Sequence, residues 1–407
     1  MDSQTHRLGR IASACLLSLA SGAALAQEPN PYYIGASQEF VHDSNFFRVA
    51  PDQAATSQTI SSTSLLAGLD QPIGRHRLFA DAALRSVRHD GNGQLDYTGN
   101  SLLAGADWSA IDVLSGRLSY GTDRKLARYG VDYGFLDPNT RVLQTSKELV
   151  FKAQYGQASV LAVEGGYTRQ EIDFSVQSSN QFEQDIYSVG VRLWPSGPLT
   201  LGIGARRTDG GYPFATLGGG VIGADNYQRD DIDLLATWVA TGASTVTARL
   251  SHTKEDHDAL PERNVSGTTG AVAWKYQPTG KLKLGLDWIR DTGASSSFNP
   301  GAAGGVAPIV NSAPLTTTWQ LQADYEVLAK VQLQAMARQY KRRLVNTAGE
   351  TGNDKLVETS LGLTWAPLRS VQVGCSVGRE KRDTDGSGLS VAFSATVSRC
   401  LAQLKLQ

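Results

Sequence analysis

A short turn sequence recurs about every 40 to 45 residues along this chain, and each copy joins two long segments of alternating polarity. Between copies lie two runs of roughly 10 to 13 residues, the length at which a tilted strand crosses a bilayer. Short turns that alternate with longer loops, bordered by aromatic residues, are typical of a transmembrane β-barrel. Aromatic residues precede many of the turns, among them Trp108, Trp194, Trp238, Tyr276, Tyr325 and Trp365. The turns are Gln71–Gly74, Ser109–Asp112, Tyr155–Ala158, Trp194–Gly197, Ala240–Ala243, Gln277–Gly280, Val327–Lys330 and Ala366–Arg369.

The alternation separates an apolar face from a polar face within each segment. In Lys281–Trp288 the even positions are apolar and the odd positions are polar or small, and Leu199–Arg206 and Val331–Arg338 repeat the pattern. Successive strand side chains point to opposite faces, so each segment has one uncharged surface. A charge facing lipid at mid-bilayer costs about 2 to 4 kcal/mol. We therefore expect Leu201, Leu284 and Leu333 to face lipid.

The repeat of short turns, alternating segments and longer loops predicts an all-β fold, a transmembrane antiparallel up-and-down β-barrel of about 18 strands. An even number of strands returns both ends of the barrel to the periplasmic side. A soluble β-propeller also repeats at about 40 residues, but its blades need four short strands per period instead of two long ones. The predicted outer loops are Asp43–Ser57, Asp90–Tyr97, Ala127–Leu143, Ser175–Gln184, Asp209–Tyr227, Glu255–Arg263, Thr292–Pro314 and Asn346–Asp354, with the last hairpin around Asp383–Gly388.

The first residues resemble a secretory signal peptide. A basic start is followed by the apolar run Ile11–Leu19 and by the small-residue motif Ala24-Leu25-Ala26. Cys15 lies inside the apolar run, which favours plain cleavage after Ala26 over lipid attachment. We expect residues 1–26 to be the signal peptide, residues 27–407 to form the barrel, and the protein to reside in a Gram-negative outer membrane.

The charge balance excludes some functions. The chain has 38 basic and 39 acidic residues, whereas a nucleic-acid-binding protein carries a basic surplus. No apolar stretch approaches the roughly 20 residues of a transmembrane helix, and the mean hydropathy is slightly negative. We therefore expect outer-membrane lipid, and not nucleic acid, as a partner.

Charged residues on the polar face of the strands are the predicted lumen groups. Their signs are mixed, so they need not impose strong ionic selectivity, and they could equally be ion pairs between neighbouring strands. Tyr129, Tyr133, Tyr212, Tyr227 and Tyr340 are the candidate groups for stacking on sugar rings. The predicted lumen-facing residues are Arg77, Arg85, Arg117, Lys152, Arg206, Asp231, Asp233, Arg249, Lys283, Asp287, Arg338 and Arg342.

No enzyme site, cofactor site or metal site is expected. A hydrolase site needs a nucleophile paired with a His that a third group orients, and none of the six His residues lies in a nucleophile motif. Glu255-Asp256-His257-Asp258 offers oxygen and imidazole ligands for a divalent cation, but a solvated loop is the simpler interpretation.

The segment Asp43-Ser44-Asn45-Phe46-Phe47-Arg48 resembles a signature of EpsL-type outer-membrane proteins, which belong to the putative β-barrel porin superfamily and accompany exopolysaccharide and exosortase loci. Gln228–Ile232, Ser244–Leu250, Pro278–Leu282 and Leu363–Arg369 are similar to later hairpins of that family. The resemblance implies a role in exopolysaccharide biosynthesis or export, with the polymer and its synthesis machinery as partners. The chain departs from a usual barrel end, because it finishes Leu404-Lys405-Leu406-Gln407 without an aromatic residue.

Two other functions remain open from the sequence. One is a general or substrate-selective diffusion porin with no connection to polysaccharide. The other is a structural barrel whose loops bind surface polymer while its lumen stays closed.

The two cysteines after the signal peptide, Cys375 and Cys400, lie on the two arms of the final hairpin. A turn centred near Asp385 would separate them beyond disulfide reach, whereas a turn centred near Ser387 would align them. The apolar residues from Leu389 to Val397 are odd-numbered, but Leu404 and Leu406 are even, which suggests a bulge near Ser398–Cys400. The hypothesis is a disulfide in an oxidising periplasm, and the alternative is two free thiols.

Overall fold

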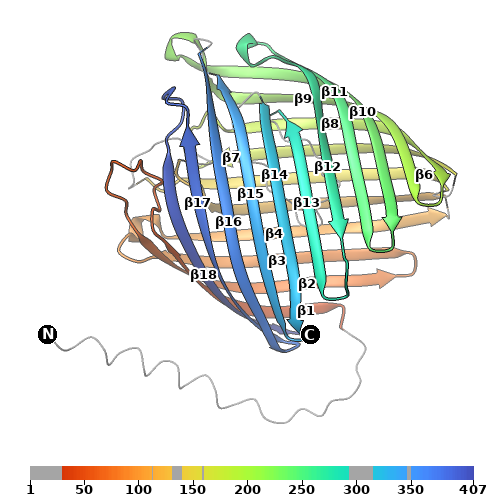
Figure 1. Cartoon of the computed structure of the whole chain (residues 1–407), viewed down its shortest axis with the longest axis horizontal. Helices are drawn as coiled ribbons and strands as arrows, with labels where there is room; N and C mark the ends of the chain where they lie inside the picture. Colours follow the sequence, from red (N-terminus) through yellow and green to blue (C-terminus); the bar gives the residue numbers. More distant parts are fainter. Residues whose placement is uncertain (1–29, 112, 131–139, 158–159, 293–314, 346–349) are drawn as a thin grey trace.

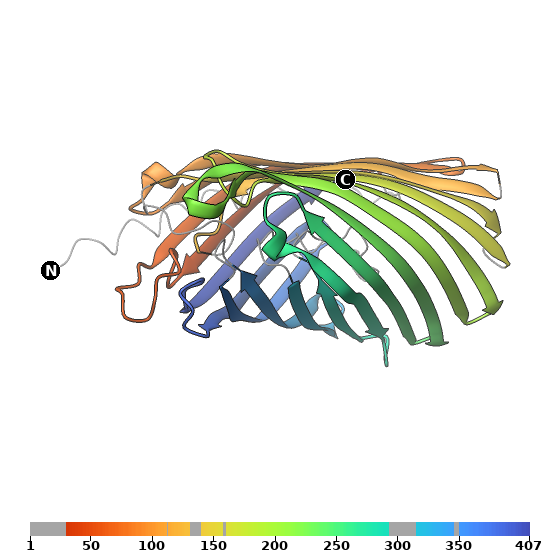
Figure 2. The ribbon, with the colours of Figure 1, turned by 90° about the horizontal axis from the view of Figure 1, so that it is seen from above.

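The computed structural model describes residues 30–111, 113–130, 140–157, 160–292, 315–345 and 350–407. In these residues, eighteen antiparallel strands form one sheet that closes on itself, because the first strand pairs with both the second and the last. The strands run obliquely and the sheet curves back on itself (Figure 1, Figure 2). The predicted barrel and its strand number are confirmed. The predicted signal peptide lies outside the described residues.

The strands follow the chain in order around the barrel. They are β1 (Tyr32–Asp43), β2 (Gln58–Ile73), β3 (His76–His89), β4 (Tyr97–Ile111), β5 (Leu114–Leu126), β6 (Leu143–Gln157), β7 (Leu161–Phe174), β8 (Phe182–Ser196), β9 (Leu199–Thr216), β10 (Ile222–Thr241), β11 (Ser244–His257), β12 (Val265–Tyr276), β13 (Leu282–Asp291), β14 (Leu315–Leu328), β15 (Val331–Val345), β16 (Thr351–Leu368), β17 (Val371–Thr384) and β18 (Phe393–Leu406). Three 3₁₀ helices lie in connections: η1 (Gly93–Leu95), η2 (Gly218–Gly220) and η3 (Pro261–Arg263). Among the described residues, no helix has the length and apolar character needed to span a membrane.

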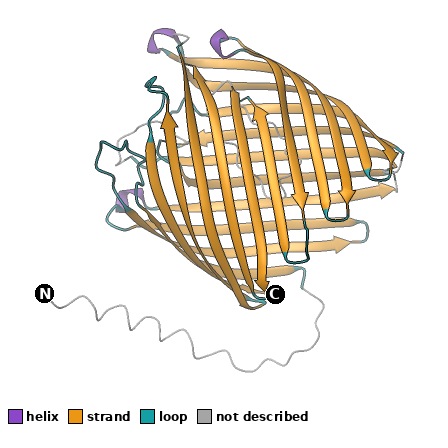
Figure 3. Cartoon of the chain, viewed as in Figure 1, coloured by secondary structure: helices purple, strands orange, loops and turns teal. Residues whose placement is uncertain are grey.

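The short and long connections lie at opposite ends of the barrel. Short turns follow the even-numbered strands from β2 to β16, at the predicted turn sequences, and the 3₁₀ helices all lie at the other end (Figure 3). The turn between β2 and β3 needs Gly74, whose φ of 61° is readily adopted only by glycine. Ile34 on β1 pairs with Leu406 on β18, so the barrel begins and ends at the short-turn end.

One predicted loop is largely strand. The residues predicted as the loop Asp209–Tyr227 instead extend β9 to Thr216 and start β10 at Ile222. In this part of the hairpin the apolar side chains point inward, where Tyr212, Ala215 and Tyr227 are buried in a small apolar cluster. The outward alternation is lost because this part of the hairpin extends past the apolar belt on the outer surface.

Cross-strand pairing places the apolar face on the outside. Leu234 on β10 pairs with Ile203 on β9, and both side chains are more than half exposed although both are aliphatic. Three positions further along the same strands Asp231 pairs with Arg206, and both of these side chains are buried on the opposite face. An exposed aliphatic surface suits lipid, and the opposite polar face must then line the interior.

The last hairpin has no bulge, contrary to the prediction. Cys375 pairs directly with Cys400 in an unbroken register from Val371 to Arg382. Phe393 is buried on the inner face, where the guanidinium of Arg382 lies 4.9 Å from its ring centre. The apolar phase changes because the upper inner face of β18 is covered by other parts of the chain, not because the strand is interrupted.

The two cysteine sulfur atoms are 2.17 Å apart in the structure, and the Cα atoms are 4.1 Å apart. We predict that the mature protein, unfolded without reductant, contains no thiol that alkylating reagents can modify. Mass spectrometry before and after reduction measures this, with two modified cysteines expected only after reduction. Two alkylated cysteines in the unreduced protein would contradict the pairing.

The register also predicts which side chains meet water. A cysteine at Lys283, an exposed inner-face position on β13, should react with a charged thiol reagent when the barrel is held in lipid nanodiscs. A cysteine at the neighbouring Leu284 should react slowly, because lipid covers it. The unfolded variants provide the control, since both should then be labelled equally. Faster labelling at Leu284 would overturn the assignment of faces.

Candidate functional site

The inner face of the barrel carries all of the charged residues that the sequence assigned to the lumen. Cross-strand partners share a face, so the chain of pairs around the barrel assigns each side chain to the inside or the outside. The residues fall into separate clusters and do not form one site. The inner-face residues are Arg77, Arg85, Arg117, Lys152, Arg206, Asp231, Asp233, Arg249, Lys283, Asp287, Arg338 and Arg342.

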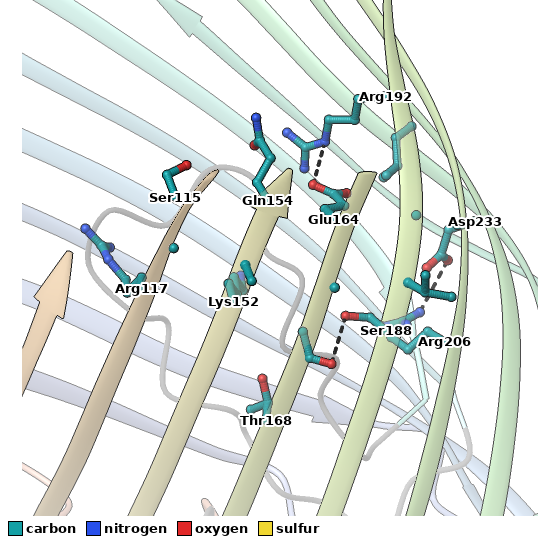
Figure 4. A pocket seen from close by; sticks show the side chains of 18 of the residues that line it. Ser115, Arg117, Lys152, Gln154, Glu164, Thr168, Ser188, Arg192, Arg206 and Asp233 are labelled. Carbon is teal, nitrogen blue, oxygen red and sulfur yellow. Dashed lines mark hydrogen bonds and ion pairs between the residues drawn. The ribbon is translucent and has the colours of Figure 1, made fainter. Parts of the chain in front are cut away.

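A cavity of about 570 Å³ lies against the inner wall, along β4 to β10 (Figure 4). Arg192 Nε lies 2.9 Å from a carboxylate oxygen of Glu164, and Arg117 Nη2 donates to Asp107 at 2.9 Å. Lys152 lies between these pairs (Figure 4). It is exposed, and within the described part of the chain its ammonium group has neither an ion pair nor a hydrogen bond. Lys152 is therefore a cation without an ion-pair partner in the described residues, beside the paired cations Arg117 and Arg192.

A buried network of ion pairs connects the strands from β9 to β13. Arg206 Nη2 lies 3.0 Å from Asp231, and Arg249 Nη2 donates to Asp291 at 2.8 Å. Arg229 Nη1 reaches the same Asp291 at 2.7 Å. These side chains are almost fully buried, so they hold the wall together and do not meet a passing solute.

Two members of this network were missed from the sequence. Arg229 precedes Asp231 by two residues and shares its face, so the alternation contained the signal. Asp291 is the last residue of β13, where the strand pattern ends before the long loop. Position on the inner face could have been predicted for Arg229, whereas the pairing of Asp291 with two arginines depends on the register.

The remaining predicted residues also have local partners in most cases. Arg338 Nε donates to Gln320 at 2.6 Å, and Arg342 Nε donates to Asp354 at 2.8 Å. Arg85 lies 3.3 Å from Asp123. Lys283 borders a second hollow of about 370 Å³ near the short turns.

Arg77, near the short turns, also has a local partner: its Nε donates to Asp70 at 2.6 Å.

The Asp43–Arg48 motif folds the first long loop against the inner wall. Arg48 Nη1 lies 2.8 Å from Asp43, and its Nη2 lies 2.8 Å from Glu380 on β17. Arg48 has a φ of 54°, an uncommon conformation for a residue other than glycine, and these charged contacts hold it. The motif that resembles the EpsL-type signature therefore has a structural role at the mouth of the barrel.

A second segment reaches across the interior toward the same strands. Arg128, just after β5, lies 3.5 Å from Glu358 on β16, and the carbonyl of Gly130 accepts a hydrogen bond of 2.6 Å from Arg382 on β17. The ring of Tyr129 packs against Phe47 with centres 5.1 Å apart. These contacts narrow the mouth at the end opposite the short turns.

The candidate sugar-stacking tyrosines do not fit that role. Tyr129, Tyr212, Tyr227 and Tyr340 are 3 to 5% exposed, so their ring faces are not open to a sugar. They pack against neighbouring rings and hydrogen-bond partners instead, and the prediction was wrong for these four. Tyr133 lies outside the described residues.

The segment Glu255–Asp258 does not converge on one point. His257 Nδ1 lies 2.8 Å from Asp225 and its Nε2 lies 3.2 Å from Glu255, but Asp256 points to the outer surface and pairs with Lys254 at 2.8 Å. The described residues contain no group of His, Cys, Asp and Glu side chains arranged to hold a metal ion.

Comparisons with known proteins concern the fold. No protein-family model matches the chain, and no curated protein matches it. Among solved structures, it is similar to the outer-membrane protein OpdK of Pseudomonas aeruginosa, with 14% identity over 92% of this chain and 99% of that one, at a TM-score of 0.47. It is also similar to OpdQ of Pseudomonas aeruginosa, with 12% identity over 93% of this chain and 99% of that one, at a TM-score of 0.48. A likeness of this degree concerns barrel architecture alone.

The predicted role in exopolysaccharide export is contradicted, because the similar solved structures are Opd and Occ outer-membrane proteins. The later hairpin motifs did not indicate a function, because strands and turns of this kind occur in any barrel hairpin. The Asp43–Arg48 motif holds the loop after β1 against the inner wall. The chain is an outer-membrane β-barrel. The alternative interpretation, a general or substrate-selective diffusion porin, remains a proposal.

The buried network predicts that removal of one carboxylate, that of Asp291, lowers the free energy of unfolding strongly. Asp291→Ala leaves Arg229 and Arg249 buried without their shared partner, so we expect a loss of about 3 to 5 kcal/mol in the free energy of unfolding. Urea unfolding in lipid vesicles measures it. The control is Asp230→Ala, an exposed position 3.9 Å from Arg207, where we expect less than about 1 kcal/mol. Equal effects would show that the network does not support the wall.

Proposed function

We propose that this protein is an outer-membrane diffusion channel that favours small anionic solutes. The observation that carries the proposal is the polar cavity on the inner wall with Lys152 exposed in it. A charged group that lines a water-filled passage attracts ions of the opposite sign and repels ions of its own sign.

The charges around the cavity are predominantly positive. Arg117, Arg192 and Arg206 are held in ion pairs with neighbouring carboxylates, which leaves them partly neutralised. Lys152 adds a charge that no carboxylate within ion-pair distance offsets in the described residues. The basic lining residues are Arg75, Arg117, Lys152, Arg192 and Arg206, and the acidic ones are Asp107, Glu164 and Asp233.

The narrowed opening at the long-loop end of the barrel favours passage of small solutes over passage of a polymer. The segments after β1 and β5 are anchored to β16 and β17 by Arg48, Arg128 and Arg382, so the opening at the long-loop end is reduced. A passage of this kind suits molecules that diffuse singly. The burial of the four tyrosines also removes the aromatic surfaces that a sugar polymer would stack on.

Reversal potentials in planar bilayers test the proposal. Under a KCl gradient we expect discrete conductance steps and a reversal potential that favours chloride. Lys152→Glu replaces the unneutralised cation by an anion, so the reversal potential should shift toward that of a cation-selective channel.

The matched control is Lys254→Glu, an exposed position on the outer face of β11 that cannot meet a permeating ion. It should leave the reversal potential unchanged. Absence of conductance steps from the folded protein would remove the channel proposal. Equal reversal potentials for the wild-type protein and Lys152→Glu would remove the anion preference.

A further inference from the structure

On the outer surface of β13 to β16, basic side chains follow directly above the apolar belt. Outward residues such as Trp288, Trp319 and Val357 form the upper part of the belt. Above them, Arg290 on β13 pairs with Thr317, Thr317 pairs with Lys341, and Lys341 pairs with Lys355 on β16. One cross-strand row thus carries three basic side chains on the outer face.

These basic groups have no neutralising partner in the described residues. Arg290, Lys341 and Lys355 are exposed, and none of them makes an ion pair or a hydrogen bond there. Asp383 is next in the row, but its carboxylate pairs with Lys381 at 2.8 Å. Lys341 and Lys355 stand directly opposite each other, an arrangement of like charges that destabilises a sheet.

A hollow of about 520 Å³ lies beside this row. Lys341, Arg343, Lys355 and Asp383 line it on the outer side. Asp385 is also at its edge, with its carboxylate bonded to the amides of Asn353 and Ser387. Arg343, one pleat above Lys341, likewise has no partner in the described residues.

The opposite side of the same outer surface differs. There the basic groups are paired: Lys147 lies 2.9 Å from Glu171, Arg169 lies 3.0 Å from Glu171, and Lys254 lies 2.8 Å from Asp256. The barrel therefore neutralises its rim charges internally over β6 to β11, whereas basic groups on β13, β15 and β16 have no partner in the described residues. We call the unneutralised set Arg290, Lys341, Arg343 and Lys355 the basic rim.

We propose that the basic rim binds the phosphate groups of a phosphorylated glycolipid in the outer leaflet. The rim lies where the apolar belt ends, at the level of lipid headgroups, so acyl chains can lie on the belt while phosphates reach the cations. Ammonium and guanidinium groups bind phosphate with charge-assisted hydrogen bonds. The same phosphate would relieve the repulsion between Lys341 and Lys355.

Binding of diphosphorylated lipid A to the purified full-length barrel tests this proposal. The protein in detergent micelles is titrated with lipid A in the presence of EDTA, and bound lipid is counted by native mass spectrometry. Lys341→Gln combined with Lys355→Gln should weaken binding about 30-fold, which corresponds to about 2 kcal/mol at about 1 kcal/mol per basic group. Lipid A without phosphates should bind the wild-type protein as weakly as diphosphorylated lipid A binds this double variant.

Two controls separate charge from folding. Lys341→Arg combined with Lys355→Arg keeps the charges and should retain wild-type binding, and Lys254→Gln on the paired side should also retain it. If inorganic phosphate alone displaces lipid A, the basic rim is a site for the free anion and not for the lipid. Equal lipid A binding by the glutamine double variant and the wild-type protein, or equal binding of the dephosphorylated lipid, would overturn the proposal.

Discussion

Closure of the sheet is the constraint on which the rest of this molecule depends. A bilayer offers no water to backbone amides and carbonyls, so a strand that crosses it must have a partner on both sides. The pairing of β1 with both β2 and β18 provides this at the point where the two ends of the chain meet. Because the sheet is closed, side chains on its outer face within the apolar belt meet lipid, and those on its inner face meet the interior.

The inner face uses its charges in two ways. Along β9 to β13, arginines and carboxylates are buried together, and their mutual attraction offsets the cost of removing them from water. Along β4 to β8, the ion pairs are more exposed and Lys152 has no partner in the described residues. The first arrangement gives a rigid wall, and the second gives a surface that a dissolved anion can reach.

The outer face shows a similar division around the circumference. Rim charges over β6 to β11 are paired with other side chains, whereas the basic rim on β13, β15 and β16 faces outward without partners in the described chain. The disulfide partners Cys375 and Cys400 also lie on the outer face, within the belt below these charges. A barrel embedded in an asymmetric membrane can therefore present different sides to the surrounding lipid.

The sequence by itself determined the number of strands, the positions of the short turns and the face of the charged residues that it assigned to the lumen. Strand alternation has a period of two and lipid penalises charge, so both signals are local and can be read from segments such as Lys281–Trp288. Only the tertiary structure decided which residues meet. Arg48 contacts Glu380 across 332 positions, Cys400 is aligned with Cys375 by an unbroken register, and the tyrosines of the long loops are buried. Such contacts depend on how loops fold into a closed barrel and on register between strands, and local periodicity specifies neither.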